Sequence, residues 1–313
     1  KIRISDFKNG ETIDSVFIIK QKELKKTKTG NEYLTLKLVD ASGEVEAKYW
    51  DGFLDFYNTL VDAAVVRIYG DVGEYNGKVQ LTIKKGKLAD QSEYDLADLI
   101  PHTKKNIEEM YKELILVIDS ITDSDLQKLL KAFFCDAEFV AKYKKAPAAV
   151  NMHSACIGGL LEHTVNLINL ALFIASEYEN IDRDLLLTGA ILHDMGKIDE
   201  LNYSLAFSYG NRGKLVGHIT MGVLMLNEKI KQLDSFPENK KIKLEHMILS
   251  HHGVPEFGAV KQPMTIEAVA LAQIDNLDAK IVGFNEFVEK NPPDENGWTS
   301  RSYMFDNREL FVD

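Results

Sequence analysis

The 313-residue sequence has only 2 cysteines, 7 prolines and 2 tryptophans, and it contains no run of 18 apolar residues. Cys135 and Cys156 do not form a CxxC pair, so a reducing cytoplasm is favoured over a disulfide scaffold. Without a long apolar run, no membrane-spanning helix is expected. The first ten residues, KIRISDFKNG, lack the apolar segment of a signal peptide, so secretion is not indicated.

The formal net charge is −11, which gives the chain no overall attraction for nucleic acid. The charge is uneven, however, because residues 1–90 have 15 Lys and Arg against 14 Asp and Glu, and the remaining 223 residues have 22 against 34. The acidic excess therefore lies in the second part of the chain, where it suits cation binding. A local basic groove in the first part is still compatible with this composition.

The first 90 residues show the alternation and turn signals of β-strands. Residues 32–40, EYLTLKLVD, alternate strictly between an apolar face with Leu34, Leu36 and Leu38 and a face with Tyr33, Thr35 and Lys37. The dipeptide Asn76-Gly77 separates two further strand-like runs and is a strong signal for a two-residue hairpin. Residues 51–61 favour a short helix. Five short strands with one interposed helix predict an OB-type β-barrel.

From residue 92 onward the apolar residues repeat with a helical period, and Asp182 is expected to cap one of the helices. The length suggests two or three domains. We therefore expect a multidomain α and β protein with a five-stranded OB-type barrel over 1–90, a helical linker over 91–150, an all-α helical bundle over 151–290 and a C-terminal arm over 291–313. The apolar anchors expected to dock that arm are Trp298, Tyr303, Phe305 and Phe311.

Seven of the eight histidines lie between residues 153 and 252, and several of them stand at the ends of apolar helices. The ordered set is His163, His193-Asp194, His218, His251-His252 and Asp275, followed by Asp278 on the same helix face. A single helical histidine is more often a core or surface residue than a ligand. The whole series on separate helices instead favours a site for Mn, Fe, Co or Zn, which imidazole and carboxylate groups bind well.

This series, together with the stretches GGLLEHT and HDMGK, resembles the HD superfamily of metal-dependent phosphohydrolases in its two-metal form. The resemblance implies two divalent ions per site, which activate a water and stabilise the leaving oxygen of a phosphodiester when they lie about 3.5–4 Å apart. Asp194 would bridge them. The first ion would take His163, His193, Asp194 and Asp275, and the second His218 and His251, with His252 either a ligand or a supporting partner.

Other residues near this series have roles outside the set of metal ligands. Lys197 is similar to the lysine of this superfamily that contacts a substrate phosphate, although a cation is also favoured at a helix end. Gly196 is expected to let the chain turn away from the helix. His153 either faces the phosphate or is structural, and Asp278 is a second candidate for substrate contact. His246 is left out, since it lies about 140° from His251 around a helix.

An OB barrel binds single strands through cations and stacking rings. The candidate contacts are Tyr33, Lys37, Lys48, Trp50, Arg67, Tyr75, Lys78 and Gln80. For each aromatic residue the alternative is a place in the barrel core, and for Trp50 the core is favoured over contact with a strand.

The order of OB barrel, helical linker and two-metal HD bundle resembles the YhaM family of bacterial 3′-5′ exoribonucleases. The resemblance implies hydrolytic removal of nucleotides from the 3′ end of single-stranded RNA, with single-stranded DNA as a second substrate and manganese as the ion. A homo-oligomer is left open. Two alternatives stay open as well, an HD phosphohydrolase for small nucleotides and a non-catalytic single-strand-binding protein. A cyclic-dinucleotide phosphodiesterase is disfavoured, because SHHGVPE lacks the Gly-Tyr-Pro of that subgroup.

Overall fold

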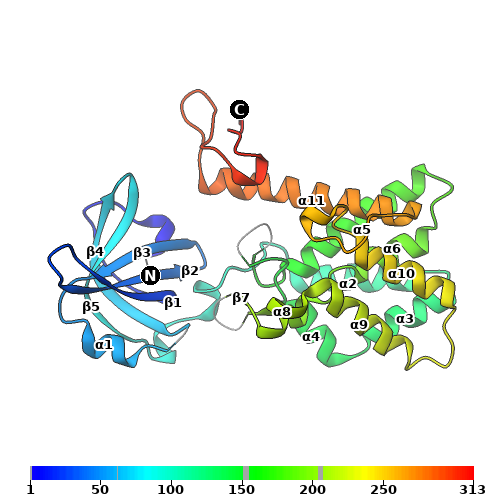
Figure 1. The fold of residues 1–313 in the computed structure, drawn as a ribbon, viewed down its shortest axis with the longest axis horizontal. Helices are drawn as coiled ribbons and strands as arrows, with labels where there is room; N and C mark the ends of the chain where they lie inside the picture. The colour runs from blue at the N-terminus through cyan, green and yellow to red at the C-terminus, as the bar shows by residue number, and fades with distance from the viewer. Residues whose placement is uncertain (1, 62, 151–154, 204–206) are drawn as a thin grey trace. The chain divides into compact units, whose positions relative to one another are not determined.

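The computed structural model describes residues 2–61, 63–150, 155–203 and 207–313. These residues form two compact units, one ending at His102 and one beginning at Thr103. Figure 1 colours the first unit blue to cyan and the second green to red. The segment 91–150, expected as a separate linker, is divided between the two units, because its helices pack into the second.

The first unit is a closed barrel with the strand order β1-β2-β3-β5-β4, in which β1 also pairs with β4. Its strands are β1 (Thr12–Lys26), β2 (Glu32–Asp40), β3 (Gly43–Tyr49), β4 (Val65–Tyr75) and β5 (Lys78–Leu88). The only parallel pair among these is β3 with β5, and the helix α1 (Leu54–Thr59) lies between β3 and β4 in sequence. The expected OB-type barrel is confirmed, including its interposed helix.

Two local predictions in the barrel also hold. Asn76 and Gly77 have φ values of 52° and 73°, the pair of left-handed residues that a type I′ hairpin turn requires. The alternation in β2 places its three leucines inside the barrel, each with 0% exposure. The other face of β2 therefore points outward and presents Tyr33, Thr35 and Lys37.

The second unit is a helical bundle around one shared apolar core. Its helices are α2 (Ile107–Asp119), α3 (Ser124–Phe134), α4 (Ala137–Lys145), α5 (Gly159–Glu177), α6 (Arg183–Leu192), α7 (Lys197–Glu200), α8 (Asn211–Val216), α9 (His218–Ile230), α10 (Glu238–Ser250) and α11 (Ile266–Lys290). Two short strands, β6 (Leu201–Asn202) and β7 (Ser208–Tyr209), pair between α7 and α8. The Asp182 side chain accepts a hydrogen bond from the Leu185 amide at 3.0 Å and caps α6 as expected.

One described helix, α5, is long and apolar enough by length and composition to cross a membrane, with a mean hydropathy of 1.3. A buried core helix has the same composition. Half of α5 is buried in the bundle, and its buried face includes His163 and Thr164. Through these polar side chains, α5 forms one side of the site described below.

Tyr143 connects three helices of this core through one hydroxyl group. The side chain is 1% exposed, and burial raises its pKa well above the ordinary value in spite of the contact with the Thr164 hydroxyl, so it stays protonated. Its hydroxyl lies 2.7 Å from Thr164 Oγ1 on α5 and donates to the Ile191 carbonyl on α6 at 3.0 Å. Tyr143 on α4 therefore ties α5 to the end of α6.

The C-terminal arm is held by fewer apolar anchors than the sequence indicates. Phe305 packs edge-on against Phe284 of α11, with ring centroids 5.8 Å apart, and this contact lies where Figure 1 shows the red arm beside α11. Trp298, Tyr303 and Phe311 are instead 46%, 89% and 52% exposed. The prediction of four buried anchors was therefore wrong for three of them, because the arm pairs with itself through the Trp298–Phe311 bridge.

Candidate metal centre and strand-binding face

The second unit brings seven of the histidines and aspartates predicted from sequence into one cluster. The helix α6 is buried along its whole length, so its last turn leads His193 and Asp194 directly into the core. These two residues are 0% and 2% exposed. His163 comes from α5, His218 from the start of α9, His251 from the end of α10 and Asp275 from α11. The topology thus gathers residues separated by more than a hundred positions.

The histidine rings are oriented by hydrogen bonds at Nδ1. His193 Nδ1 lies 2.9 Å from the Ala190 carbonyl, and His251 Nδ1 lies 2.7 Å from the Ile248 carbonyl. Because a carbonyl oxygen can only accept, Nδ1 must carry the proton in each ring. The Nε2 atom is then left with a free electron pair, as a metal ligand requires.

The same rule extends to the other rings of the cluster. His163 Nδ1 lies 2.7 Å from Asp278 Oδ2, His218 Nδ1 lies 3.1 Å from Glu200 Oε1, and His252 Nδ1 lies 2.8 Å from the Phe257 carbonyl. All five imidazoles therefore have an acceptor at Nδ1. This is the usual arrangement of histidines that bind a metal through Nε2.

Three buried atoms test whether the cluster fits a metal. Asp194 Oδ1, His218 Nε2 and His251 Nε2 are inaccessible to solvent and make no hydrogen bond. A buried polar atom without a partner lowers the stability of the folded state by about 1–3 kcal/mol. Three such atoms in contact therefore indicate one shared partner. The two nitrogens lie 3.4 and 3.5 Å from the same Asp194 oxygen. A divalent cation between them satisfies all three atoms, and the residues present therefore fit such an ion.

The ligand atoms form two neighbouring groups. His163, His193 and Asp275 make one group, and Asp194, His218, His251 and His252 make the other. Asp194 touches both, since its Oδ2 lies 3.3 Å from His193 Nε2 while its Oδ1 faces the second group. The residues thus offer places for two ions with one carboxylate between them.

Lys197 Nζ lies 2.6 Å from Asp194 Oδ2. Burial would raise the pKa of Asp194, but the charge of Lys197 and then His193 hold that pKa well below its ordinary value. Burial would likewise lower the pKa of Lys197, and Asp194 raises it. The lysine, whose side chain is 13% exposed, is therefore charged and bound to the carboxylate, within one helical turn of the cluster.

Asp278 has a different role from the substrate contact expected from the sequence. Its Oδ2 accepts from His163, and its Oδ1 accepts from the Asn166 amide at 3.0 Å, so both oxygens are occupied inside the protein. Burial would lower the pKa of His163, but hydrogen bonds to Asp275 and Asp278 raise it to about 10. The Nε2 proton must leave before that atom binds a metal. Asp278 thus orients His163 from behind.

We expect Asp278→Asn to lower activity and metal affinity by about 10- to 100-fold, the usual cost of losing a carboxylate behind a histidine ligand. The neutral amide keeps the shape but supports the His163 ring less well. Titration with Mn²⁺ gives the affinity, and nucleotide release gives the rate. Glu289→Gln is the control, because Glu289 is an exposed carboxylate on the same helix, paired with Lys104. Equal effects of the two substitutions would contradict this role.

Gly196 is needed for close packing and not for a turn. Its φ and ψ are −62° and −18°, a helical conformation open to any residue. A Cβ atom at this position would lie 2.1 Å from the His218 carbonyl oxygen and 2.8 Å from the Gly222 amide nitrogen. The chain does turn at residues 193–196, as expected, but that turn does not need the conformational freedom of glycine. Glycine lets α9 approach closely enough for His218 to reach Asp194.

Glu200 was missed in the sequence. It is 6% exposed at the end of α7, and its Oε1 accepts from the backbone amide of His218 at 2.9 Å as well as facing the ring. No repeating pattern in this short polar segment marks the glutamate as buried. Its pairing with His218 therefore becomes evident only in the folded structure.

Two further histidines occur in this part of the sequence. His246 accepts a hydrogen bond from the Met264 amide at 2.8 Å through Nε2 and is outside the cluster, as expected. His153, the candidate for phosphate contact, lies outside the described residues.

In the barrel, four of the predicted strand contacts form one outward-facing group. The rings of Tyr33 and Trp50 stack with centroids 4.5 Å apart and an interplanar angle of 25°. Lys48 Nζ lies 5.8 Å from the Trp50 centroid and 5.1 Å from that of Tyr75. Trp50 is 41% exposed, so the preference for a core position was wrong. It follows Tyr49 at the end of β3, where the strand leaves the barrel wall.

The other predicted barrel contacts are less available. Arg67 is held by Asp14 at 2.7 Å and Glu93 at 2.7 Å, and these hydrogen bonds raise its pKa further. Its cation is thus already neutralised by two carboxylates. Lys37 pairs with Glu44 at 2.5 Å, and Gln80 donates to Glu46 at 2.6 Å. Lys78 is exposed opposite Tyr75 at the hairpin.

Comparison with protein families gives one match to each unit. The HD domain family matches residues 160–280, and an OB-fold nucleic acid binding domain family matches residues 18–89. Among solved structures, the second OB-fold domain of replication protein A from Methanococcus maripaludis is 15% identical. It covers 28% of this chain and 94% of its own, with a TM-score of 0.24.

Two curated relatives match almost the full chain. The 3'-5' exoribonuclease YhaM of Bacillus subtilis (strain 168) is 35% identical over 303 residues, which are 96% of this chain and 95% of that protein. The 3'-5' exoribonuclease YhaM of Bacillus velezensis is 35% identical over 306 residues, with the same coverage of each chain. The similarity therefore includes both units and the order in which they occur.

Proposed function

Because the chain belongs to the YhaM family of 3′-5′ exoribonucleases, we propose that it removes nucleotides by hydrolysis from the 3′ end of single-stranded RNA. The single observation that carries this proposal is the buried cluster in which five imidazoles have their Nδ1 atoms paired around Asp194. Single-stranded DNA is a second substrate to test, and a cytoplasmic location agrees with the low cysteine content.

His163, His193, Asp194 and Asp275 would hold one divalent ion, and His218, His251 and His252 would hold a second together with Asp194, with manganese as the first candidate. Such ions would supply water activation and charge stabilisation at the phosphodiester. The opposite directions in which the two Asp194 oxygens point support this bridging role.

The protein groups have separate tasks around the scissile phosphodiester. Asp278, Glu200 and the backbone carbonyls keep the imidazole nitrogens aimed inward. The Lys197 ammonium, fixed by Asp194, places a positive charge where phosphoryl oxygens gain negative charge, and such charge stabilises the transition state. The dry surroundings of the cluster strengthen each of these electrostatic interactions.

The parts of the chain expected from the sequence have different tasks in this proposal. Residues 1–90 hold the strand and residues 151–290 cleave it, while residues 103–150 and 291–313 support the helical unit. The stacked rings of Tyr33 and Trp50 with Lys48 beside them suit strand binding, since stacking of bases on aromatic rings is independent of sequence.

We expect Trp50→Ala to weaken binding of a twelve-nucleotide RNA about tenfold, because stacking on one ring contributes about 1–3 kcal/mol per base. Cleavage of a dinucleotide, which is too short to span the barrel face, should be unchanged. Fluorescence anisotropy measures the first quantity and product release the second. Trp298→Ala is the matched control, as Trp298 is the other tryptophan of the chain and is similarly exposed. An equal loss for both RNA lengths would argue against a strand-holding role.

The proposed activity is tested with a 5′-labelled single-stranded oligonucleotide and Mn²⁺. A ladder that shortens from the 3′ end, with release of nucleoside monophosphates, is the expected result. A panel of deoxynucleoside triphosphates examines the small-nucleotide alternative. Consumption of those nucleotides with no attack on the oligonucleotide would overturn the proposal, and binding without any hydrolysis would favour a non-catalytic binding protein.

A further inference from the structure

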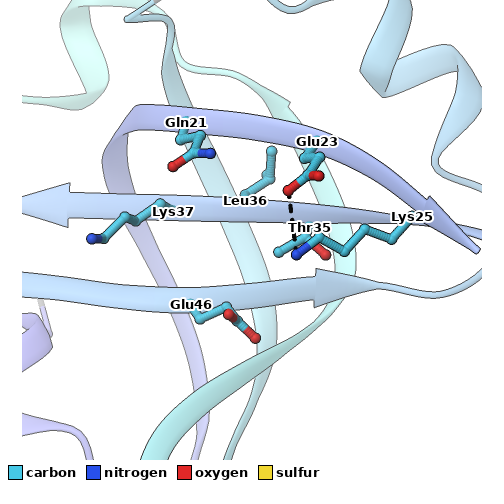
Figure 2. Close-up of a pocket in the computed structure, with 7 residues that line it drawn as sticks. All are labelled: Gln21, Glu23, Lys25, Thr35, Leu36, Lys37 and Glu46. Atoms are coloured by element: carbon cyan, nitrogen blue, oxygen red, sulfur yellow. Dashed lines mark ion pairs between the residues drawn. The ribbon is translucent and has the colours of Figure 1, made fainter.

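The outer face of the barrel contains a pit centred on Thr35 of β2. The strand register places Glu23 of β1 directly opposite Thr35 on one side and Lys48 of β3 on the other. Threonine is the shortest side chain here and is surrounded by long ones. The resulting pocket of about 240 Å³, seen in Figure 2, is lined by Gln21, Glu23, Lys25, Thr35, Leu36, Lys37 and Glu46.

The floor of this pocket has a polar atom without a partner. Thr35 is 9% exposed, and its Oγ1 is buried and makes no hydrogen bond. Such an atom is costly unless a ligand or water pairs with it. The pocket is also adjacent to the stacked rings, because Tyr33 is two residues before Thr35 on the same face of β2 and stacks on Trp50.

The charges around the pocket do not suit a phosphate. Lys25 pairs with Glu23 at 3.2 Å, the dashed contact in Figure 2, and Lys37 pairs with Glu44. A phosphate site needs cations that are free to pair with it. The lining instead alternates carboxylate, amide, hydroxyl and ammonium groups, which suits a neutral ligand with several polar atoms along its edge.

We propose that the Thr35 pocket holds one base of the bound strand and favours bases with an exocyclic amino group over uracil. This inference rests on the proposed action on single-stranded RNA. The volume, below the roughly 300 Å³ of pockets for drug-sized ligands, suits a single base. Glu23 and Glu46 pair with Lys25 and Gln80 through one carboxylate oxygen each, so the second oxygen of each can accept a hydrogen bond from an exocyclic amine. The Gln21 amide pairs with adenine. Uracil has only oxygens at its exocyclic positions, and these face the carboxylates unfavourably.

The test compares two twelve-nucleotide oligomers, one of adenosine and one of purine riboside, which is adenosine without its amino group. Binding to the full chain is measured by fluorescence anisotropy in the presence of a chelator, which prevents cleavage. We expect the adenosine oligomer to bind at least about threefold tighter, and Thr35→Val to weaken its binding about three- to tenfold, as for loss of one hydrogen bond. Valine keeps the shape of threonine without the hydroxyl.

Thr82→Val is the matched control, since Thr82 is exposed on β5 and pairs with Lys48 in the register, outside the pocket. It should leave both affinities unchanged. Equal affinity of the wild-type chain for the two oligomers, or an unchanged affinity in Thr35→Val, overturns the proposal. If the chain still degrades both oligomers with Mn²⁺ in that case, the pocket proposal alone fails. If it neither binds nor degrades them, the proposed function fails as well.

Discussion

Asp194→Asn is expected to lower the rate of nucleotide release by at least about 10³-fold, the largest effect of any single substitution in this chain. The two Asp194 oxygens face both groups of ligands, and no other described residue does so. The amide has nearly the same shape but no negative charge, so it holds neither ion firmly. The rate is measured on a 5′-labelled RNA with Mn²⁺, and the bound metal by elemental analysis.

A loss of activity in this variant needs separation from a loss of stability. Without the carboxylate, the Lys197 ammonium is left buried and unpaired, which costs about 3–5 kcal/mol in comparable buried pairs. The double variant Asp194→Asn, Lys197→Met removes both charges and should regain stability while it stays inactive. Asp199→Asn, five residues away and paired with Lys142 on the surface, is the control for activity. Nuclease activity retained in Asp194→Asn would refute the bridging role.

Removal of the metal is expected to abolish hydrolysis and to lower the melting temperature of the helical unit by about 5–10 °C. An ion present at a hundred times its dissociation constant stabilises the folded state by about 2.7 kcal/mol. Each kcal/mol shifts the melting temperature by about 2–4 °C for a domain of this size. Circular dichroism at 222 nm, with and without a chelator, follows the helices, and added Mn²⁺ should restore both properties.

The barrel provides an internal control for this measurement. Its only tryptophan is Trp50, so a Trp298→Phe background makes tryptophan fluorescence report on the barrel alone. That signal should melt at the same temperature with and without the chelator. An unchanged melting temperature of the helices, together with full activity in the chelator, would exclude a metal at the cluster.

Much of the fold was predictable because its signals are local. The alternation of leucines in β2 and the Asn76-Gly77 turn each depend on a few neighbouring residues, and both are as expected. The histidine series was predictable for a related reason, since most of its members stand at or near the end of an apolar helix, with Asp275 in the middle of α11 as the exception. The resemblance to a known superfamily then implied which of them belong together.

The residues that were misjudged all depend on partners distant in sequence. The i,i+3 spacing of Asp275 and Asp278 places both on one face of α11, but it does not tell which one stands behind His163. Gly196 was assigned to the turn alone, because the sequence does not show how closely α9 approaches it. Trp50 and the aromatic residues of the arm could be buried in a core or exposed on a surface with the same local sequence. Only the fold shows that they are exposed.

The distance between two of the ligand histidines depends on Tyr143, a residue outside the metal site. Its hydroxyl bonds to the residue after His163 and to the carbonyl two residues before His193, so one oxygen atom sets the spacing of the two helices that bear them. The imidazole nitrogens of these helices lie 3.3 Å apart. The spacing of the two helices that bear these ligands is therefore held from the apolar core, by a residue outside the ligand cluster.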